Sequence, residues 1–142
     1  MKFDNPLVAV SLAVVGIEFD NRDGSNRRFA LAMCEVGDRI ELRLEPDNPA
    51  DENAVAVYSA GGMQIGYITS VRAVRISALL RDGREIQAVL QRKTKFGAWI
   101  RVAFDGERPA LTSAMLEDHD EPEAEPVREE PDFYPDEVWP DD

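Results

Sequence analysis

The sequence predicts a mainly β protein, a small barrel or half-open sheet of about six to seven strands with one main α-helix. Short apolar segments typical of strands recur through residues 1–116, separated by loops rich in glycine, proline and asparagine. One segment with helical spacing lies among them, and an acidic, proline-rich segment follows. We therefore expect one folded domain over residues 1–116 and a disordered acidic tail over residues 117–142.

The first half of the expected domain supplies strands separated by polar loops. Leu7–Phe19 is rich in valine, as in a long strand buried on much of both faces. A turn-forming loop at residues 21–26 separates it from the apolar segment Phe29–Cys34, which we interpret as a further short strand. Apolar and charged residues alternate over Ile40–Glu45, a pattern typical of a half-buried strand.

The second half contains a hairpin and two longer strands. Ala54–Tyr58 and Met63–Tyr67 flank the turn sequence Ser59–Gly62, whose two glycines are a strong hairpin signal. Arg84–Arg92 and Trp99–Phe104 are the last two predicted strands.

One helix is predicted between these strands, over Val71–Leu80. Thr69 or Ser70 supplies its N-terminal cap, and Gly83 is suited to end it. We expect its core-facing stripe to consist of Val71, Val74, Ala78 and Leu79.

The net charge of −12 is concentrated in the tail. Residues 117–142 contain 13 acidic residues and one basic residue, Arg128, whereas residues 1–116 contain 15 of each. The tail also holds five of the nine prolines and no glycine, a composition that buries too little apolar surface to fold by itself. The acidity of the whole chain therefore says little about the ligand of the domain.

Few residues are available for catalysis or metal binding. One cysteine, Cys34, excludes an internal disulfide, and one histidine, His119, leaves no histidine pair for a metal or a catalytic relay. The carboxylates of Glu45–Glu52 suggest a magnesium-dependent nuclease site, but a solvated loop in which Asp51 and Asn53 cap their own turn is the simpler interpretation. We expect no enzymatic activity, no metal and no cofactor.

A membrane-spanning helix needs about 20 consecutive apolar residues, and no apolar run in the sequence is that long. The apolar stretch near the N-terminus lacks a convincing signal-peptide cleavage site, which favours a cytoplasmic chain.

Four segments in order carry a resemblance to a known family. Glu45–Val57 contains the run Asn-Pro-x-Asp-x-Asn-Ala-Val, Val14–Ile17 precedes it, and Ile65–Ile68 and the helix Val71–Leu80 follow. In these segments, and over residues 8–104 as a whole, the chain resembles a HIRAN domain. The resemblance implies a compact OB-like β-barrel.

The resemblance also implies a function. In the family's best-understood members, large replication-fork remodelling ATPases, the domain is an accessory module that captures the 3′ end of single-stranded DNA. This sequence has no Gly-x-x-x-x-Gly-Lys phosphate loop, so a binding module without a motor is implied.

The family's end-binding turn is matched in part. Asn48, Pro49, Asp51 and Asn53 agree with it, but Ala50 stands at its aromatic position. In the DNA-binding members the aspartate contacts the terminal 3′-hydroxyl, and Asp51 inherits that role. A carboxylate suits it, since it accepts a hydroxyl proton and repels a terminal phosphate.

The aromatic positions of the implied pocket are altered. Glu18, Phe19 and Asp20 stand where those members carry Arg-Tyr-Tyr, which leaves Phe19 for base stacking beside two new negative charges. Tyr67 replaces a phosphate-contacting histidine, and Trp99 falls nearest the late aromatic of the pocket.

A basic segment gives independent support for nucleic-acid binding. Val71–Arg101 contains eight basic and two acidic residues, a net charge of +6, with Phe96 and Trp99 interleaved. Cations alternating with aromatics are what single-strand binding by phosphate contact and stacking requires. The alternative is a solvated basic surface, and for Trp99 alone we favour burial in the core. The expected contacts from this segment are Arg72, Arg75, Lys93, Lys95, Phe96 and Trp99.

The tail carries three aromatics among its carboxylates, Phe133, Tyr134 and Trp139. They could imitate a nucleic-acid strand on the basic surface, dock a replication or repair protein, or belong to a tail without a target. We predict a non-enzymatic module that binds single-stranded DNA or its 3′ ends and is tuned by the tail. The alternative is a protein-interaction adaptor that has lost DNA binding and recruits a partner through the tail.

Overall fold

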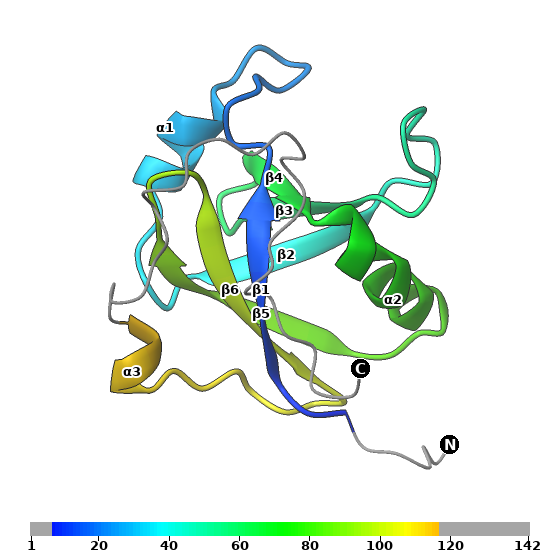
Figure 1. Ribbon diagram of the computed structural model, residues 1–142, viewed down its shortest axis with the longest axis vertical. Helices are drawn as coiled ribbons and strands as arrows, with labels where there is room; N and C mark the ends of the chain where they lie inside the picture. The colour runs from blue at the N-terminus through cyan, green and yellow to red at the C-terminus, as the bar shows by residue number, and fades with distance from the viewer. Residues whose placement is uncertain (1–6, 117–142) are drawn as a thin grey trace.

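The computed structural model describes residues 7–116, which form a closed barrel of six antiparallel strands (Figure 1). Around the barrel the strands follow the order β1, β4, β3, β2, β5, β6. The predicted mainly β barrel is confirmed. In chain order the strands are β1 (Val10–Val15), β2 (Arg39–Leu44), β3 (Val55–Ser59), β4 (Gln64–Ile68), β5 (Ile86–Lys93) and β6 (Ala98–Phe104).

The core fills the inside of the barrel with alternate residues of each strand. In β6, Ile100 and Val102 point inward and are fully buried, so Trp99 and Arg101, which alternate with them, lie on the outer surface. In β1, Leu12 belongs to the same core. This alternation decides which side chains of the basic segment reach the surface.

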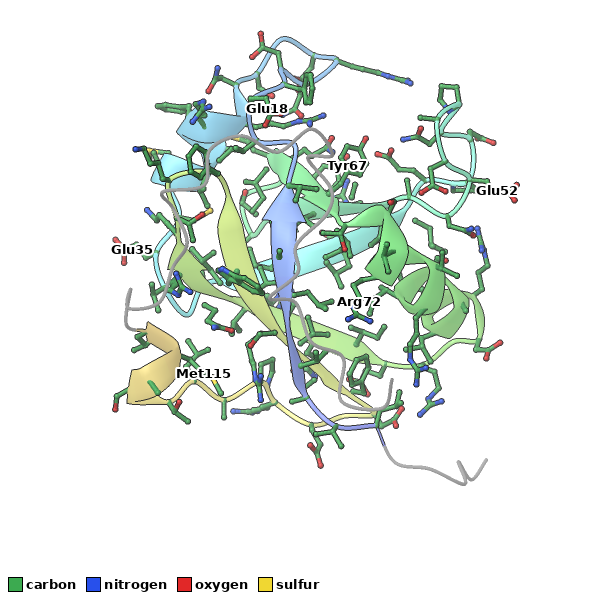
Figure 2. The ribbon with its side chains drawn as sticks, viewed as in Figure 1. Glu18, Glu35, Glu52, Tyr67, Arg72 and Met115 are labelled. Carbon is green, nitrogen blue, oxygen red and sulfur yellow. The ribbon has the colours of Figure 1, made fainter. Side chains whose placement is uncertain are left out.

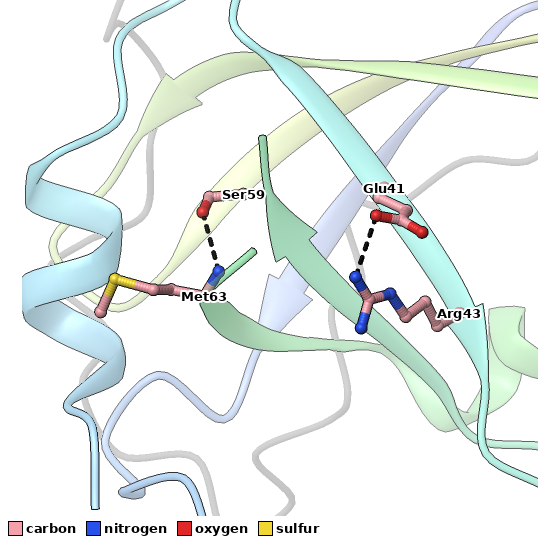
Figure 3. Close-up of polar contacts among 4 residues, drawn as sticks. All are labelled: Glu41, Arg43, Ser59 and Met63. Carbon is pink, nitrogen blue, oxygen red and sulfur yellow. Dashed lines mark hydrogen bonds and ion pairs between the residues drawn. The ribbon is translucent and has the colours of Figure 1, made fainter. Parts of the chain in front are cut away.

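β3 and β4 form the predicted hairpin. The backbone N–H of Met63 donates to Ser59 Oγ at 3.2 Å, which closes the turn (Figure 3). Gly62 adopts a φ of +92°, a left-handed conformation that favours glycine. On the neighbouring strand β2, Arg43 forms an exposed ion pair with Glu41 at 3.1 Å.

The first predicted strand, Leu7–Phe19, is too long. β1 ends at Val15 because Gly16 turns the chain with a φ of +81°. Residues 17–26 then form a loop above the barrel instead of continuing the strand.

A short helix, α1 (Arg27–Ala32), replaces the strand predicted over Phe29–Cys34. Asn26 caps it, because its side-chain oxygen accepts the backbone N–H of Phe29 at 2.9 Å. Its buried residues follow helical spacing toward Cys34, whose thiol is buried and donates to the carbonyl of Ala30 at 3.3 Å. Burial raises the pKa of that thiol.

The main helix, α2 (Ser70–Arg81), lies where it was predicted. Thr69 caps it by accepting the N–H of Arg72 at 3.4 Å, and Gly83 follows its end with a φ of +80°.

The predicted core stripe of α2 is wrong at three of its four positions. Val71 and Val74 are 65% and 55% exposed, and Ala78 is exposed as well. The helix instead packs through Ala73, Ile76, Ser77 and Leu79. Small side chains at two of these positions allow a close approach to the barrel, which apolar spacing alone did not reveal.

A third helix, α3 (Ser113–Leu116), follows the barrel and was not predicted. It lies beside β5, where Gln91 Nε2 donates to the carbonyl of Met115 at 3.4 Å (Figure 2). Between residues 7 and 116, no helix combines the length and apolar character needed to cross a membrane.

Candidate nucleic-acid interface

One outer surface of the barrel gathers arginines around Trp99. Trp99 is the register partner of Ala13 in β1 and of Arg92 in β5, and Arg101 lies opposite Ser11. Directly opposed residues share a sheet face, so these side chains lie on the same outer surface. We call the surface formed by Arg72, Arg75, Arg92, Trp99 and Arg101 the arginine face.

The first turns of α2 border this face. β4 pairs with β1 at Ile68 and Val14, and α2 starts two residues after Ile68. The start of α2 therefore lies along the side of β1 opposite to β6, and Figure 2 shows Arg72 beside β1. Arg75 follows Arg72 by three residues and so shares its side of the helix.

Hydrogen bonds fix the middle of the arginine face. Arg101 Nη1 donates to Ser11 Oγ at 2.9 Å, and that hydroxyl donates to Gln91 Oε1 at 2.7 Å. The Arg92 guanidinium lies 6.0 Å from the centre of the Trp99 ring, within reach of a cation–π contact. Burial lowers the pKa of Arg101 from its usual high value, yet an arginine stays charged at neutral pH.

Trp99 is half-buried and does not belong to the core, so the preference for core burial was wrong. The turn between β5 and β6 extends the surface: Lys95 and Phe96 are exposed there, with the ammonium 5.7 Å from the ring centre. Both aromatics of the basic segment are thus accessible, one on the face and one at its end.

The basic segment is not one continuous patch, because three of its cations hold other elements together. Arg81 donates to Asn53 Oδ1 and to the carbonyl of Glu52, both at 3.0 Å. Arg84 forms a two-pronged ion pair with Asp105 at 2.9 and 2.8 Å.

Lys93 is the third of these cations. Its ammonium donates to the carbonyl of Ala32 at the end of α1, at 3.2 Å. A cation there complements the helix dipole, so the structure gives Lys93 a role in packing α1.

A second candidate surface is a cleft of about 590 Å³ between the loop after β1 and the loop after β2. We call it the loop cleft. Glu45 lies in it and accepts the hydroxyl of Tyr67 at 2.8 Å and the amide of Asn48 at 3.0 Å. Burial, with a smaller contribution from Glu45, raises the pKa of Tyr67 and keeps its hydroxyl a neutral donor.

Arg27 lines the loop cleft and is only 8% exposed. It donates to Asn21 Oδ1 at 2.7 Å and to the carbonyl of Gly16 at 2.8 Å, and it lies 5.3 Å from the Tyr67 ring centre. Its donors therefore fix the loop after β1.

Comparison with known proteins assigns the chain to a family. The family model of the HIRAN domain matches residues 9–105, most of the chain. The chain belongs to the HIRAN domain family. The resemblance found in the sequence is thereby confirmed.

Two solved structures share the fold of this HIRAN domain. The crystal structure of the HIRAN domain of human HLTF is 19% identical, with a TM-score of 0.57 over 72% of this chain and 81% of that chain. A crystal structure of a protein from Lactobacillus plantarum is 20% identical, with a TM-score of 0.54 over 68% and 97%. No curated protein sequence matches the chain.

In this HIRAN domain the loop cleft is lined by more carboxylates than cations. Asp20, Asp23, Glu45 and Asp47 face Arg22 and Arg27, and the donors of Arg27 are directed to the protein. Phosphates are repelled by such a lining. Phe19, at the edge of the loop after β1, is 57% exposed and accessible for stacking.

The family's turn residues do not all reach this cleft. Asn48 lines it, but Asp51 and Asn53 do not. Asp51 Oδ1 accepts the N–H of Asn53 at 2.8 Å, and the side-chain oxygen of Asn53 accepts from Arg81. Both residues thus hold the turn and its contact with α2, as a self-capping loop requires.

Within residues 7–116, no group of three or more acidic, histidine or cysteine side chains is placed to hold a metal ion. The aromatics Phe133, Tyr134 and Trp139, and the tail as a whole, lie outside the described residues.

The site prediction from sequence omitted Arg92, Arg101 and the polar pair Ser11 and Gln91. A signal for Arg101 was present, because it follows Trp99 by two residues in a strand and so shares its face. The pairing of Ser11 with Arg101 depends on strand register, which the sequence of either strand alone does not contain.

Proposed function

We propose that this HIRAN domain is a nucleic-acid-binding module that holds single-stranded DNA across the arginine face. The observation that carries the proposal is the gathering of Arg72, Arg75, Arg92 and Arg101 around Trp99 on one outer surface of the barrel. Arginines bind the phosphates, and Trp99 with Phe96 provides the flat surfaces on which bases stack. Membership of the HIRAN family supports a nucleic-acid ligand.

Recognition of a 3′ end is a separate part of the proposal. Asn48 and Asp51 match the family's end-binding turn, and they lie apart from the arginine face on the loop between β2 and β3. A strand that crosses the face toward this loop would present its free hydroxyl to Asp51. A terminal phosphate there would be repelled by the carboxylate of Asp51.

The domain acts, in this proposal, by binding alone, as an accessory to replication or repair proteins in the cytoplasm. The acidic tail lowers the affinity for the strand or recruits such a protein. The adaptor function is the second candidate, and one observation favours it: Phe29 on α1 and Met33, the C-terminal cap of α1, are 57% and 66% exposed. An apolar surface of this kind is typical of protein contacts.

The test is fluorescence anisotropy of the full-length protein with a labelled single strand of about 12 nucleotides. Arg72→Glu with Arg75→Glu is expected to weaken binding by at least about tenfold, and to flatten the salt dependence. The matched control is Arg28→Glu with Arg108→Glu, which changes the net charge equally at two exposed positions, one on α1 and one after β6. Equal affinities of the two variants would contradict the proposal.

Two further experiments test the recognition of a 3′ end and the adaptor function. Strands that end in a 3′-hydroxyl or a 3′-phosphate measure end recognition, and Asp51→Ala should abolish any preference for the hydroxyl. The adaptor function is tested by capture of a protein from an extract, with and without nuclease treatment. If capture depends on Phe29 and Met33 and survives the nuclease, and if no strand binds at low salt, the adaptor function replaces the proposal.

A further inference from the structure

The arginine face has no carboxylate close to it in its own segment. Residues 70–101 contain two acidic residues, Asp82 and Glu85. Both follow the C-terminal end of α2, whereas Arg72 lies in its first turn, about 15 Å away along the helix axis. The segment that supplies most of the face is therefore strongly positive around it.

Arg101 has one donor that the described residues leave unused. Its Nη1 is satisfied by Ser11, but its Nε is buried and, among the residues that the structure describes, has no hydrogen-bond partner. A charged guanidinium with an unused donor favours negative charge beside it.

The tail begins beside the arginine face. Gln91 connects the two, since its amide donates to the carbonyl of Met115 in α3 and its oxygen accepts the hydroxyl of Ser11, the partner of Arg101. Leu116 is the last described residue (Figure 2 labels its neighbour Met115). The 26 residues that follow can extend about 85 Å. A domain of this size has a radius of gyration of only about 13 Å.

We propose that the C-terminal segment, residues 132–142, binds the arginine face when nucleic acid is absent and is displaced by a bound strand. The segment carries five carboxylates and the aromatics Phe133, Tyr134 and Trp139. Its carboxylates pair with the guanidinium groups, and its aromatic rings stack on Trp99 and on the arginines, as phosphates and bases do. This inference rests on the proposed function in one respect, since displacement requires the strand to use the same surface.

The two tryptophans of the chain allow a direct test, because one lies on the face and the other in the segment. In the nitrogen–proton NMR spectrum of the full-length protein without nucleic acid, each gives one indole signal. We expect the heteronuclear NOE of the Trp139 indole to approach that of Trp99, and to fall toward the value of a mobile side chain as salt is added.

Substitutions at both partners sharpen the test. Arg72→Glu with Arg75→Glu should lower the Trp139 NOE to that of a mobile side chain, and the control pair Arg28→Glu with Arg108→Glu should leave it unchanged. A second pair of substitutions, Phe133→Ala with Tyr134→Ala, changes the segment and leaves the residues of the arginine face intact. These two substitutions should lower the NOE and raise the affinity for a single strand by at least about fivefold.

The outcomes separate this inference from the proposed function. The inference is overturned, even if strands bind, by either of two results. The Trp139 NOE is that of a mobile side chain in the unsubstituted protein at low salt, or it does not change in the Arg72→Glu with Arg75→Glu variant. A high Trp139 NOE that falls in the Arg72→Glu with Arg75→Glu variant supports contact of the segment with the face. If, in addition, no variant binds a strand, the nucleic-acid proposal is overturned.

Discussion

Replacement of Gly66 by alanine tests how closely β4 lies against β1. A β-carbon at this position would overlap the carbonyl oxygen of Val15 and come within 2.8 Å of Val14 Cγ1. β1 cannot move aside easily, because its other edge is paired with β6 over five residues. Overpacking of a well-filled interior costs about 1–3 kcal/mol, and overlap with backbone lies at the upper end, so we expect Gly66→Ala to lower the free energy of unfolding by about 3 kcal/mol.

Urea unfolding of the full-length protein, followed by tryptophan fluorescence, measures this loss. Gly61→Ala is the matched control, because a β-carbon there meets only Ser59 Oγ at 3.8 Å and the backbone has an ordinary φ. We expect the control to change the free energy of unfolding by less than about 0.5 kcal/mol. Equal unfolding midpoints for the two variants would show that β4 does not lie against β1 as described.

Three further predictions address the cap, an ion pair and the ligand surface. Asn26→Ala removes the acceptor for the N–H of Phe29 and should lower the free energy of unfolding by about 1 kcal/mol, measured by urea unfolding. Arg84 lowers the pKa of Asp105 below its ordinary 3.8, so this pair stabilises the fold above that pH and the stabilisation is lost as the pH falls. The melting temperatures of the unsubstituted protein and Asp105→Asn should therefore differ at neutral pH and converge well below pH 3.8; a constant difference would exclude this origin. Trp99→Ala should weaken single-strand binding about tenfold in anisotropy, and unchanged affinity would exclude stacking on Trp99.

Elements that carry their signals within a few residues were predictable from the sequence. The hairpin of β3 and β4 was identified because Gly61 and Gly62 can adopt turn conformations that other residues resist. The helix α2 was located because Thr69 caps it and Gly83 ends it, and both signals lie within a few residues of the helix. Local chemistry of this kind survives in the folded protein.

Two helices were misjudged from the sequence. α1 was taken for a strand because its apolar residues suit either structure, and the cap at Asn26 was overlooked. The buried side of α2 was misjudged because Val71 and Val74 are more apolar than Ala73 and Ser77, while the barrel surface selects for small size.

The candidate site shows the same division. The basic and aromatic residue types pointed to nucleic acid, but the basic segment was treated as one surface. In the structure, strand register brings some of its arginines together on the arginine face. Arg81, Arg84 and Lys93 instead bind other parts of the protein. The family's turn could be recognised from sequence, whereas the carboxylate lining of the loop cleft required two loops distant in sequence to meet.

The most direct test of binding across the arginine face is an NMR titration of the full-length protein with a short single strand at low salt. We expect the indole signal of Trp99 and the backbone signals of Ser11 and Arg101 to shift with the added strand and to return when salt is raised. Shifts confined to the loop cleft around Tyr67 and Asn48, with Trp99 unchanged at saturation, would contradict the assignment of the arginine face as the binding surface.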